Sequence, residues 1–213
     1  MKRASEGRVS MTNKILDVLR DDINNCVYAG GQFITEAEIS EKFHVSKTPA
    51  REALNYLCQE GLLNKIPRKG YLIRQLSLAE LQSLFQFRSI LERASVELAI
   101  RFATDGDLAQ IEELAHQRLN VDDEDFFNRY NDLNVHFHLS IAQLSKNPYL
   151  VSALQNVMNL LRRDLVMDVR ENLERSLDAH VLIVEAIKKR DLEQALRVAA
   201  DQIEVVEKRL YLR

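Results

Sequence analysis

A run of ten residues at positions 45–54 constrains this chain more than any other part of it. It reads Val-Ser-Lys-Thr-Pro-Ala-Arg-Glu-Ala-Leu. Ala50, Leu54 and Leu57 recur at helical spacing, so one face of a helix here is expected to be apolar and buried. The Ser, Lys and Thr at its start, with Arg51 one turn later, are then left pointing outward.

A second short helix is expected just upstream, over residues 36–43. Thr35 and Glu38 have the spacing of a capping box, in which a Thr hydroxyl and a Glu carboxylate each satisfy a free backbone N–H at a helix start. Two short helices separated by a few residues, the second opening with hydroxyl and cationic side chains, are typical of a helix-turn-helix. In that motif the second helix presents its N-terminal end to the DNA major groove.

A turn that carries two cations follows this pair of helices. Residues 61–66 and 71–74 are short strand-like runs, and the Pro-Arg-Lys-Gly turn at 67–70 joins them. The pattern predicts a β-hairpin with cations at its tip, which is the wing of a winged helix-turn-helix.

At these residues the chain resembles the GntR family of bacterial transcription regulators. The winged helix of that family carries the pattern Val-Ser-(Arg/Lys)-Thr-Pro-x-Arg-Glu-Ala-Leu and a wing that ends in Gly. The resemblance covers residues 10–76. It implies that the chain binds double-stranded DNA. The second helix would contact the bases, the hydroxyl side chains at its start would contact phosphates, and the wing would contact the backbone or the minor groove. The residues expected to contact DNA are Ser46, Lys47, Thr48, Arg51, Arg68, Lys69 and Gly70.

Lys47 stands where the family more often has Arg. A Lys ammonium still donates to guanine, but it cannot form the planar fork of a guanidinium. Weaker base discrimination is therefore expected at that position.

One such module presents too little charge for tight specific binding, so a homodimer that reads a short inverted repeat is expected.

The charge of the chain is divided unevenly along its length. Its net charge of −3 would argue against a nucleic-acid partner if it were uniform, but residues 1–76 carry 12 Lys and Arg against 9 Asp and Glu, while residues 77–213 carry 17 against 23. A basic N-terminal part followed by an acidic C-terminal part is consistent with a protein in which only the N-terminal part contacts phosphate. Since no apolar run approaches the length of a membrane span or a signal core, a cytoplasmic protein without a membrane partner is expected.

The chain is expected to have two folded parts. Residues 1–9 are interpreted as a flexible lead, 10–76 as the winged helix-turn-helix and 77–213 as an all-helical domain. Ser10 or Thr12 is expected to cap the first helix.

The second part opens with another capping box, formed by Ser77 and Glu80, and its pattern is helical throughout. The predicted fold class is therefore mainly α, with an N-terminal winged helix-turn-helix and a C-terminal bundle of about six helices. These helices are expected over residues 78–103, 107–119, 125–144, 149–169, 171–189 and 192–210.

An all-helical domain behind a GntR-type winged helix is similar to the FadR C-terminal (FCD) type of effector domain. The motifs that carry this resemblance are Arg88-x-x-x-Glu92, Phe137-His138 and Ala179-His180. The helix count is similar to that of the shorter, VanR-like branch. The resemblance implies an effector-binding and dimerising role for residues 77–213, and release of DNA on binding a small carboxylate metabolite.

Four polar residues stand at positions that often carry metal ligands in the FCD family. Asn134 and His138 are four residues apart and share one helix face, while His180 and Gln202 lie on the last two, antiparallel helices. In the family, an Asp and three His at these positions often hold a divalent metal. Asn134 stands at the Asp position and Gln202 at one His position, so two of four ligands match and the other two are neutral amides.

Three interpretations of these residues stay open. In the first, His138 and His180, with Asn134, hold Zn, Ni or Mn in spite of the lost carboxylate and imidazole. In the second, the same residues and Gln202 hydrogen-bond an organic effector directly, with Arg88 and Arg162 available for its carboxylate. In the third, both histidines are satisfied core groups.

Two neighbouring residues that could substitute as ligands are expected to face elsewhere. Asp132 is half a turn from Asn134, and His136 is two residues from His138, so neither shares the face of its neighbour.

The sequence predicts a transcriptional regulator rather than an enzyme. A helical-bundle metalloenzyme built on His138 and His180 is the first alternative, but no HExxH and no paired Glu-x-x-His accompany them. A winged helix used for protein contact is the second. The Lys-rich surface that the motif predicts argues against it, because protein interfaces are depleted in Lys.

Overall fold

A computed structural model describes residues 2–120, 122–123, 126–169 and 173–211 of the chain. It divides into two compact units, Met1–Leu76 and Ser77–Arg213. The division falls at the predicted Ser77 capping box, in which Ser77 accepts from the Glu80 N–H and the Glu80 carboxylate binds the Ser77 N–H.

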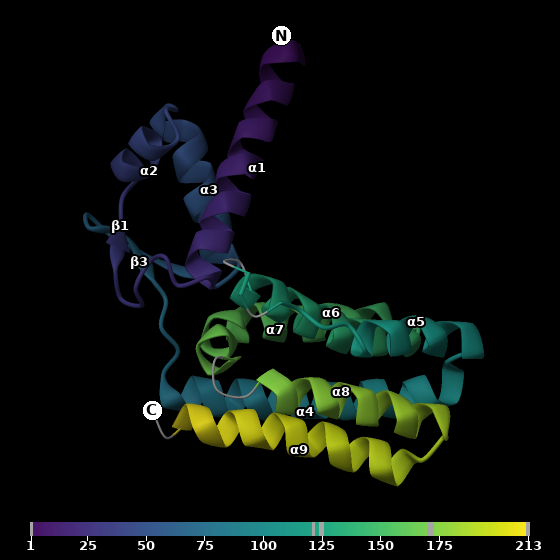
Figure 1. Ribbon diagram of the computed structural model, residues 1–213. Coiled ribbons are helices and arrows are strands. Elements are labelled where there is room, and N and C mark those ends of the chain that lie inside the picture. The colour runs from purple at the N-terminus through teal and green to yellow at the C-terminus, as the bar shows by residue number, and fades with distance from the viewer. Residues whose placement is uncertain (1, 121, 124–125, 170–172, 212–213) are drawn as a thin grey trace. The chain divides into compact units, whose positions relative to one another are not determined.

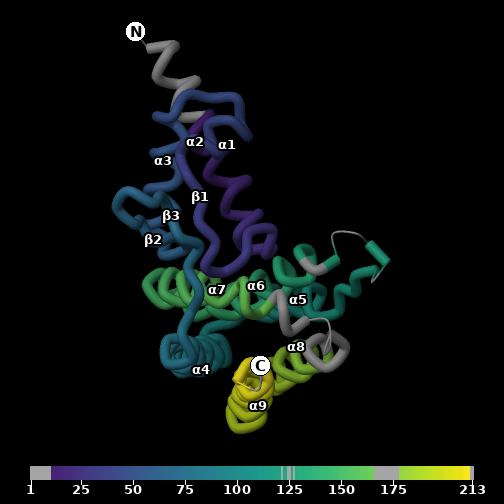
Figure 2. The backbone as a smooth tube through the Cα atoms, turned by 90° about the vertical axis from the view of Figure 1, so that its left-hand side faces the viewer, coloured from purple at the N-terminus to yellow at the C-terminus, as the bar shows by residue number. Residues whose placement is uncertain are grey.

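The N-terminal unit is a three-helix winged fold with a small antiparallel sheet in the order β1-β3-β2. Figure 2 follows its chain through the helices and the β2–β3 hairpin. The sheet contains a short strand, β1, that was not predicted. The elements are α1 (Lys2–Asn24), β1 (Phe33–Ile34), α2 (Glu36–Lys42), α3 (Lys47–Gln59), β2 (Leu63–Ile66) and β3 (Gly70–Ile73).

The first helix begins at Lys2, so the predicted start at Ser10 or Thr12 is wrong. Thr12 lies inside the helix and is buried, and its hydroxyl donates to Glu52 Oε2 of α3 at 3.0 Å. A hydroxyl that looks like a cap in the sequence therefore joins α1 to α3.

The predicted apolar face of α3 forms the centre of this unit. Ala50, Leu54 and Leu57 are fully buried, and they pack in one cluster with Ile15 and Leu19 of α1 and with residues of the sheet. This packing leaves the opposite face of α3 to carry polar side chains.

Six helices form the described part of the C-terminal unit (Figure 1). The predicted helix count is confirmed for these residues, while the starts predicted at 125 and 171 lie outside them. The helices are α4 (Leu78–Phe102), α5 (Asp105–Ala115), α6 (Phe126–Leu144), α7 (Pro148–Val169), α8 (Leu173–Lys188) and α9 (Leu192–Tyr211).

The bounds of α5 differ from the prediction at both ends. Thr104, interpreted as part of an interruption, instead caps the helix: its hydroxyl accepts from the Asp107 N–H, and Asp107 binds the Thr104 N–H. The helix therefore begins two residues early, and it ends at Ala115 rather than at Leu119, with His116 as its C-cap residue.

The C-terminal helices pack as antiparallel pairs. Figure 1 shows α4, α8 and α9 side by side, with α6 beside α7. The turn between α8 and α9 is tight because Arg190 adopts a left-handed conformation, with φ of 56°. Its guanidinium donates to the carbonyls of Ile100 and Ala103, which caps the C-terminal end of α4.

None of the helices among the described residues is both long enough and apolar enough to cross a membrane.

Candidate DNA-binding surface and effector site

The N-terminal end of α3 is uncovered within its unit. Ser46 is the N-cap residue, but its side chain makes no capping hydrogen bond, in contrast to Thr35 of α2. Ser46, Lys47 and Thr48 are all exposed. This end of α3 can thus bind an anion through its first-turn N–H groups, the positive end of the helix dipole and two hydroxyls.

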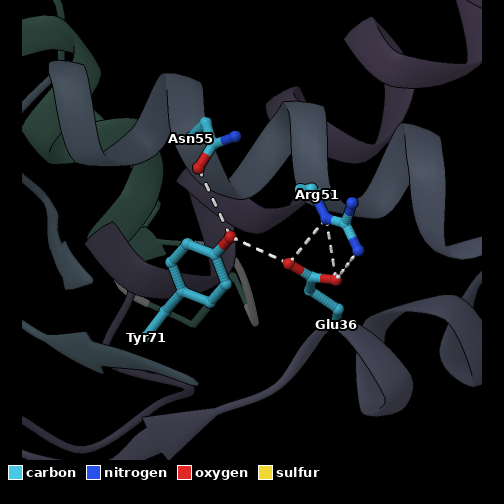
Figure 3. Close-up of polar contacts among 4 residues, drawn as sticks. All are labelled: Glu36, Arg51, Asn55 and Tyr71. Atoms are coloured by element: carbon cyan, nitrogen blue, oxygen red, sulfur yellow. Dashed lines mark hydrogen bonds and ion pairs between the residues drawn. The ribbon is translucent and has the colours of Figure 1, made fainter. Parts of the chain in front are cut away.

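Arg51 is exposed, and it is also held in place (Figure 3). Its Nε donates to Glu36 Oε1 at 2.9 Å and its Nη2 to Glu36 Oε2 at 2.8 Å. The hydrogen bonds from Arg51 lower the pKa of Glu36, so the pair is ionised at neutral pH. Because this fork uses Nε and Nη2, Nη1 is the guanidinium nitrogen outside the pair.

The pair is tied to the wing through Tyr71 of β3. The Tyr71 hydroxyl lies 3.2 Å from Glu36 Oε1 and 3.3 Å from Asn55 Oδ1, and its single proton serves one acceptor at a time. Burial and the nearby Glu36 carboxylate raise the pKa of Tyr71 to about 12, so it remains a donor. Glu36 of α2 therefore joins Arg51 of α3 to Tyr71 of the wing (Figure 3).

Sequence reasoning missed Glu36, Asn55 and Tyr71. Glu36 looks like an ordinary first-turn acidic residue, and Tyr71 like an ordinary strand residue. A contact between residues 35 apart has no local pattern.

The wing places its cations at the predicted tip. Arg68 and Lys69 are exposed, and Arg68 has a φ of 66°. Gly70 has a φ of 113°, and a Cβ there would lie 2.6 Å from the Ile34 carbonyl oxygen of β1. Gly70 is thus explained by the close approach of two strands, which sets the position of the cationic tip.

A closed polar network lies buried inside the C-terminal unit. Arg88 and Glu92 of α4 form an ion pair, with Arg88 Nε 2.6 Å from Glu92 Oε1. His138 of α6 contacts both: its Nδ1 is 2.9 Å from Glu92 Oε2, and its Nε2 is 3.1 Å from Arg88 Nη2. The three side chains are at most 6% exposed.

The network defines the tautomer of His138. A guanidinium only donates, so His138 Nε2 accepts and Nδ1–H donates to Glu92. Burial alone would raise the pKa of Glu92, but Arg88 and then His138 hold it at about 2. Both His138 nitrogens therefore have partners.

His180 of α8 lies next to this network. Its ring stacks on Phe137 with centroids 3.9 Å apart, and it meets the His138 ring edge-on with centroids at 5.3 Å. Burial lowers the pKa of His180 well below its ordinary value, so the ring is neutral. Its Nε2 is buried and has no hydrogen-bond partner among the residues that the structure describes.

The two amides of the predicted set are also interior. Asn134 and Gln202 are buried on α6 and α9. Asn131, one turn before Asn134, is 1% exposed, and neither its Oδ1 nor its Nδ2 is hydrogen-bonded within the described parts of the chain. A buried polar atom without a hydrogen-bond partner destabilises the folded state. Such atoms are therefore typical of a site where a ligand or water supplies the missing hydrogen bonds.

The other arginine of the predicted effector set is Arg162, whose Nε is buried without a hydrogen-bond partner in the described parts of the chain. Arg162 Nη2 of α7 lies 2.6 Å from Asp132 Oδ1, and the Asp132 side chain is 62% exposed. Asp132 therefore faces away from Asn134, as predicted. His136 is exposed, also as predicted, and lines a groove of about 510 Å³ between α5 and α6.

The interior donors do not form a metal site. No group of three or more His, Cys, Asp and Glu side chains within the described ranges is placed to hold a metal ion. Asn134 and Gln202 are weak neutral donors, and the His138 Nε2 lone pair is directed at Arg88. The donor chemistry thus fits direct hydrogen bonding to an organic ligand better than metal coordination.

A winged helix-turn-helix with an exposed cationic helix end, joined to a helical domain with a polar interior, defines a ligand-responsive DNA-binding protein. Residues 11–73 match the family described as bacterial regulatory proteins, gntR family, and residues 83–204 match the FCD domain. The chain belongs to the GntR family of bacterial regulators, with an FCD effector domain. It is a transcriptional regulator that binds DNA through the first domain and an effector through the second, and it is not an enzyme.

Relatives and solved structures agree with this assignment. The HTH-type transcriptional repressor RspR of Escherichia coli K12 is 26% identical over 198 residues, which cover 92% of this chain and 87% of that protein. The gluconate operon transcriptional repressor of Bacillus licheniformis is 26% identical over 200 residues, covering 89% and 81%. The E. coli McbR/YncC structure has the same fold, with a TM-score of 0.75 at 20% identity over 95% of this chain and 97% of that one.

Proposed function

We propose that this regulator is a cytoplasmic repressor that binds a short inverted repeat as a homodimer and leaves it when a small carboxylate metabolite binds the C-terminal unit. The observation that carries the proposal is the exposed start of α3, where free N–H groups, Ser46, Lys47 and Thr48 stand beside a positioned Arg51. That arrangement matches the end of a recognition helix.

Each DNA contact follows from the chemistry of its side chain. Lys47 and Arg51 serve as base or near-base contacts, with Arg51 reaching DNA through its Nη1 edge. Ser46 and Thr48 bind phosphate together with the first-turn N–H groups. Arg68 and Lys69 place the wing on the backbone or in the minor groove.

The effector binds within the polar interior of the C-terminal unit. His180 Nε2, Asn134 and Gln202 offer neutral hydrogen-bonding groups, and Arg88 Nη1 takes no part in the bonds to Glu92 and His138. A guanidinium edge beside neutral donors suits a carboxylate that also carries hydroxyl groups. The name of the gluconate operon repressor points to the same chemical class.

Dimerisation follows from the DNA-binding argument and is supported by exposed apolar residues on the C-terminal unit. Phe87 and Ile90 lie one turn apart on α4 and are 45% and 63% exposed. A self-complementary patch of this kind suits a two-fold interface.

The proposal is tested by selecting genomic fragments that the purified protein retains, and then by titrating the selected duplex by fluorescence anisotropy. The expected result is an inverted repeat bound by two chains, released by one member of a panel of sugar acids and other small carboxylates. A complex with one chain per site would contradict the dimer. Indifference to every carboxylate, with release by a neutral or cationic metabolite, would contradict the effector class.

A further inference from the structure

We propose that the interior residues of this effector site do not fit a divalent metal, because Arg88 faces the His138 nitrogen that would bind one and two of the four family ligands are neutral amides. The effector site then works without a metal. This inference rests on the proposed effector site, and it concerns what supplies the positive charge there.

The first support is the orientation of His138. A metal-bound histidine characteristically donates its second ring N–H to a carboxylate, which directs the other nitrogen at the metal. His138 makes the first of these contacts, through Nδ1 to Glu92 at 2.9 Å. Its Nε2, however, faces Arg88 Nη2 at 3.1 Å. A guanidinium thus lies where the lone pair of this ring would hold a metal.

The second support is the balance of charge in the interior. Among the residues that the structure describes, the one carboxylate in contact with His138 is Glu92, and Arg88 neutralises it at 2.6 Å. Asn134 and Gln202 add no negative charge. A dication at His138 Nε2 would meet a buried guanidinium at close range, and the described neighbours of His138 include no unpaired anion to compensate for it. Such repulsion is strong in a poorly solvated interior.

The third support is that two amides stand where the family has metal ligands. An amide in place of the Asp removes the anion that a metal needs, and an amide in place of the third His removes a strong donor. Arg88, which belongs to the motif shared with the family, remains as the cation of the site, and together with the neutral amides it can bind the oxygens of a ligand.

The test measures metal in untagged protein that has been loaded with Zn²⁺, Ni²⁺ or Mn²⁺ and then desalted. Metal content is read by inductively coupled plasma mass spectrometry, and affinity by calorimetry. No stoichiometric metal is expected in the native protein. The variant Asn134→Asp/Gln202→His restores the family ligand set, and adding Arg88→Met to it frees His138 Nε2. The triple variant is expected to bind about one equivalent, and at least about tenfold more tightly than the double variant.

A matched pair of histidine variants distinguishes an interior site from a surface one. One equivalent of metal in the native protein that His138→Gln abolishes and His136→Gln retains would overturn the inference. Metal that His136→Gln alone abolishes comes from the surface and leaves the interior site as inferred, because His136 is exposed on the same helix.

A second readout does not depend on the folding of the variants. In ¹⁵N-labelled native protein, the His138 ring is expected to show the neutral tautomer protonated at Nδ1, with a spectrum unchanged by Zn²⁺. A Zn²⁺-induced shift of the His138 and His180 ring nitrogens would contradict the inference. If that shift is seen while a carboxylate still releases the operator, the metal-free site is wrong and the proposed function stands.

Discussion

Replacing Arg51 with Ala is expected to weaken operator binding about 10- to 100-fold, because the variant loses a charged contact in the groove. It also leaves the Glu36 carboxylate facing the DNA without its partner. The fold should persist, since the Arg51 side chain is 55% exposed and its pair with Glu36 is a surface ion pair. Anisotropy titration with the selected duplex measures the loss, and circular dichroism verifies the fold.

A double-mutant cycle then tests whether Glu36 positions Arg51. Glu36→Gln alone is expected to weaken binding, because an amide cannot form the charged fork that orients the guanidinium. In the Arg51→Ala background the same change should be neutral or favourable, because it removes a carboxylate that repels phosphate. Equal losses in both backgrounds would show that Glu36 acts independently of Arg51.

Replacing Arg88 with Met is expected to destabilise the C-terminal unit by about 3–5 kcal/mol, because it leaves the Glu92 carboxylate buried without its cation. The double variant Arg88→Met/Glu92→Gln should recover part of this loss, since neither buried charge then remains. Arg93→Met is the matched control: Arg93 is exposed on the same helix, and its replacement should change stability by less than about 0.5 kcal/mol. Urea unfolding followed by circular dichroism measures all three.

The pH dependence of the Arg88→Met loss has a definite sign. In the native protein the pKa of Glu92 is held at about 2, so its contribution to stability is fully present above pH 4.5 and is lost as pH falls towards 2. Without Arg88, the buried carboxylate favours its protonated form. The deficit of the single variant should therefore shrink between pH 7 and pH 5. A deficit that is equal at both values would mean that the Glu92 charge is not its cause.

The winged helix-turn-helix could be predicted because its signals are local. A capping box at Thr35, an apolar stripe along α3 and a cationic turn at Arg68 each lie within a few residues, and all three stand where predicted. The strand β1 could not be predicted, because two residues carry no periodicity. Its place depends on pairing with β3, where Phe33 meets Leu72.

The candidate sites could be predicted as residue lists, but not as networks. Sequence reasoning selected Arg88 and His138, yet the bond between them joins residues 50 apart in the chain. The role predicted for Arg162 in effector binding stays a prediction, and its ion pair with Asp132 of the preceding helix had no signal in the sequence. Thr12 looked like a cap because a hydroxyl near a helix start has that meaning locally, and only the packing of α1 on α3 shows its partner.

The central claim is that the exposed start of α3 enters a DNA groove, and the salt dependence of operator binding tests it most directly. The logarithm of the binding constant should fall linearly with the logarithm of salt concentration, with a slope near −0.9 for each phosphate neutralised. Lys47→Ala should make this slope shallower by roughly one for each bound protomer, because a lysine ammonium that enters the groove beside the bases also neutralises phosphate charge and displaces a counterion. Lys189→Ala, on the C-terminal unit, should leave the slope unchanged. Binding that is insensitive to salt, or a slope that Lys47→Ala does not alter, would contradict the account.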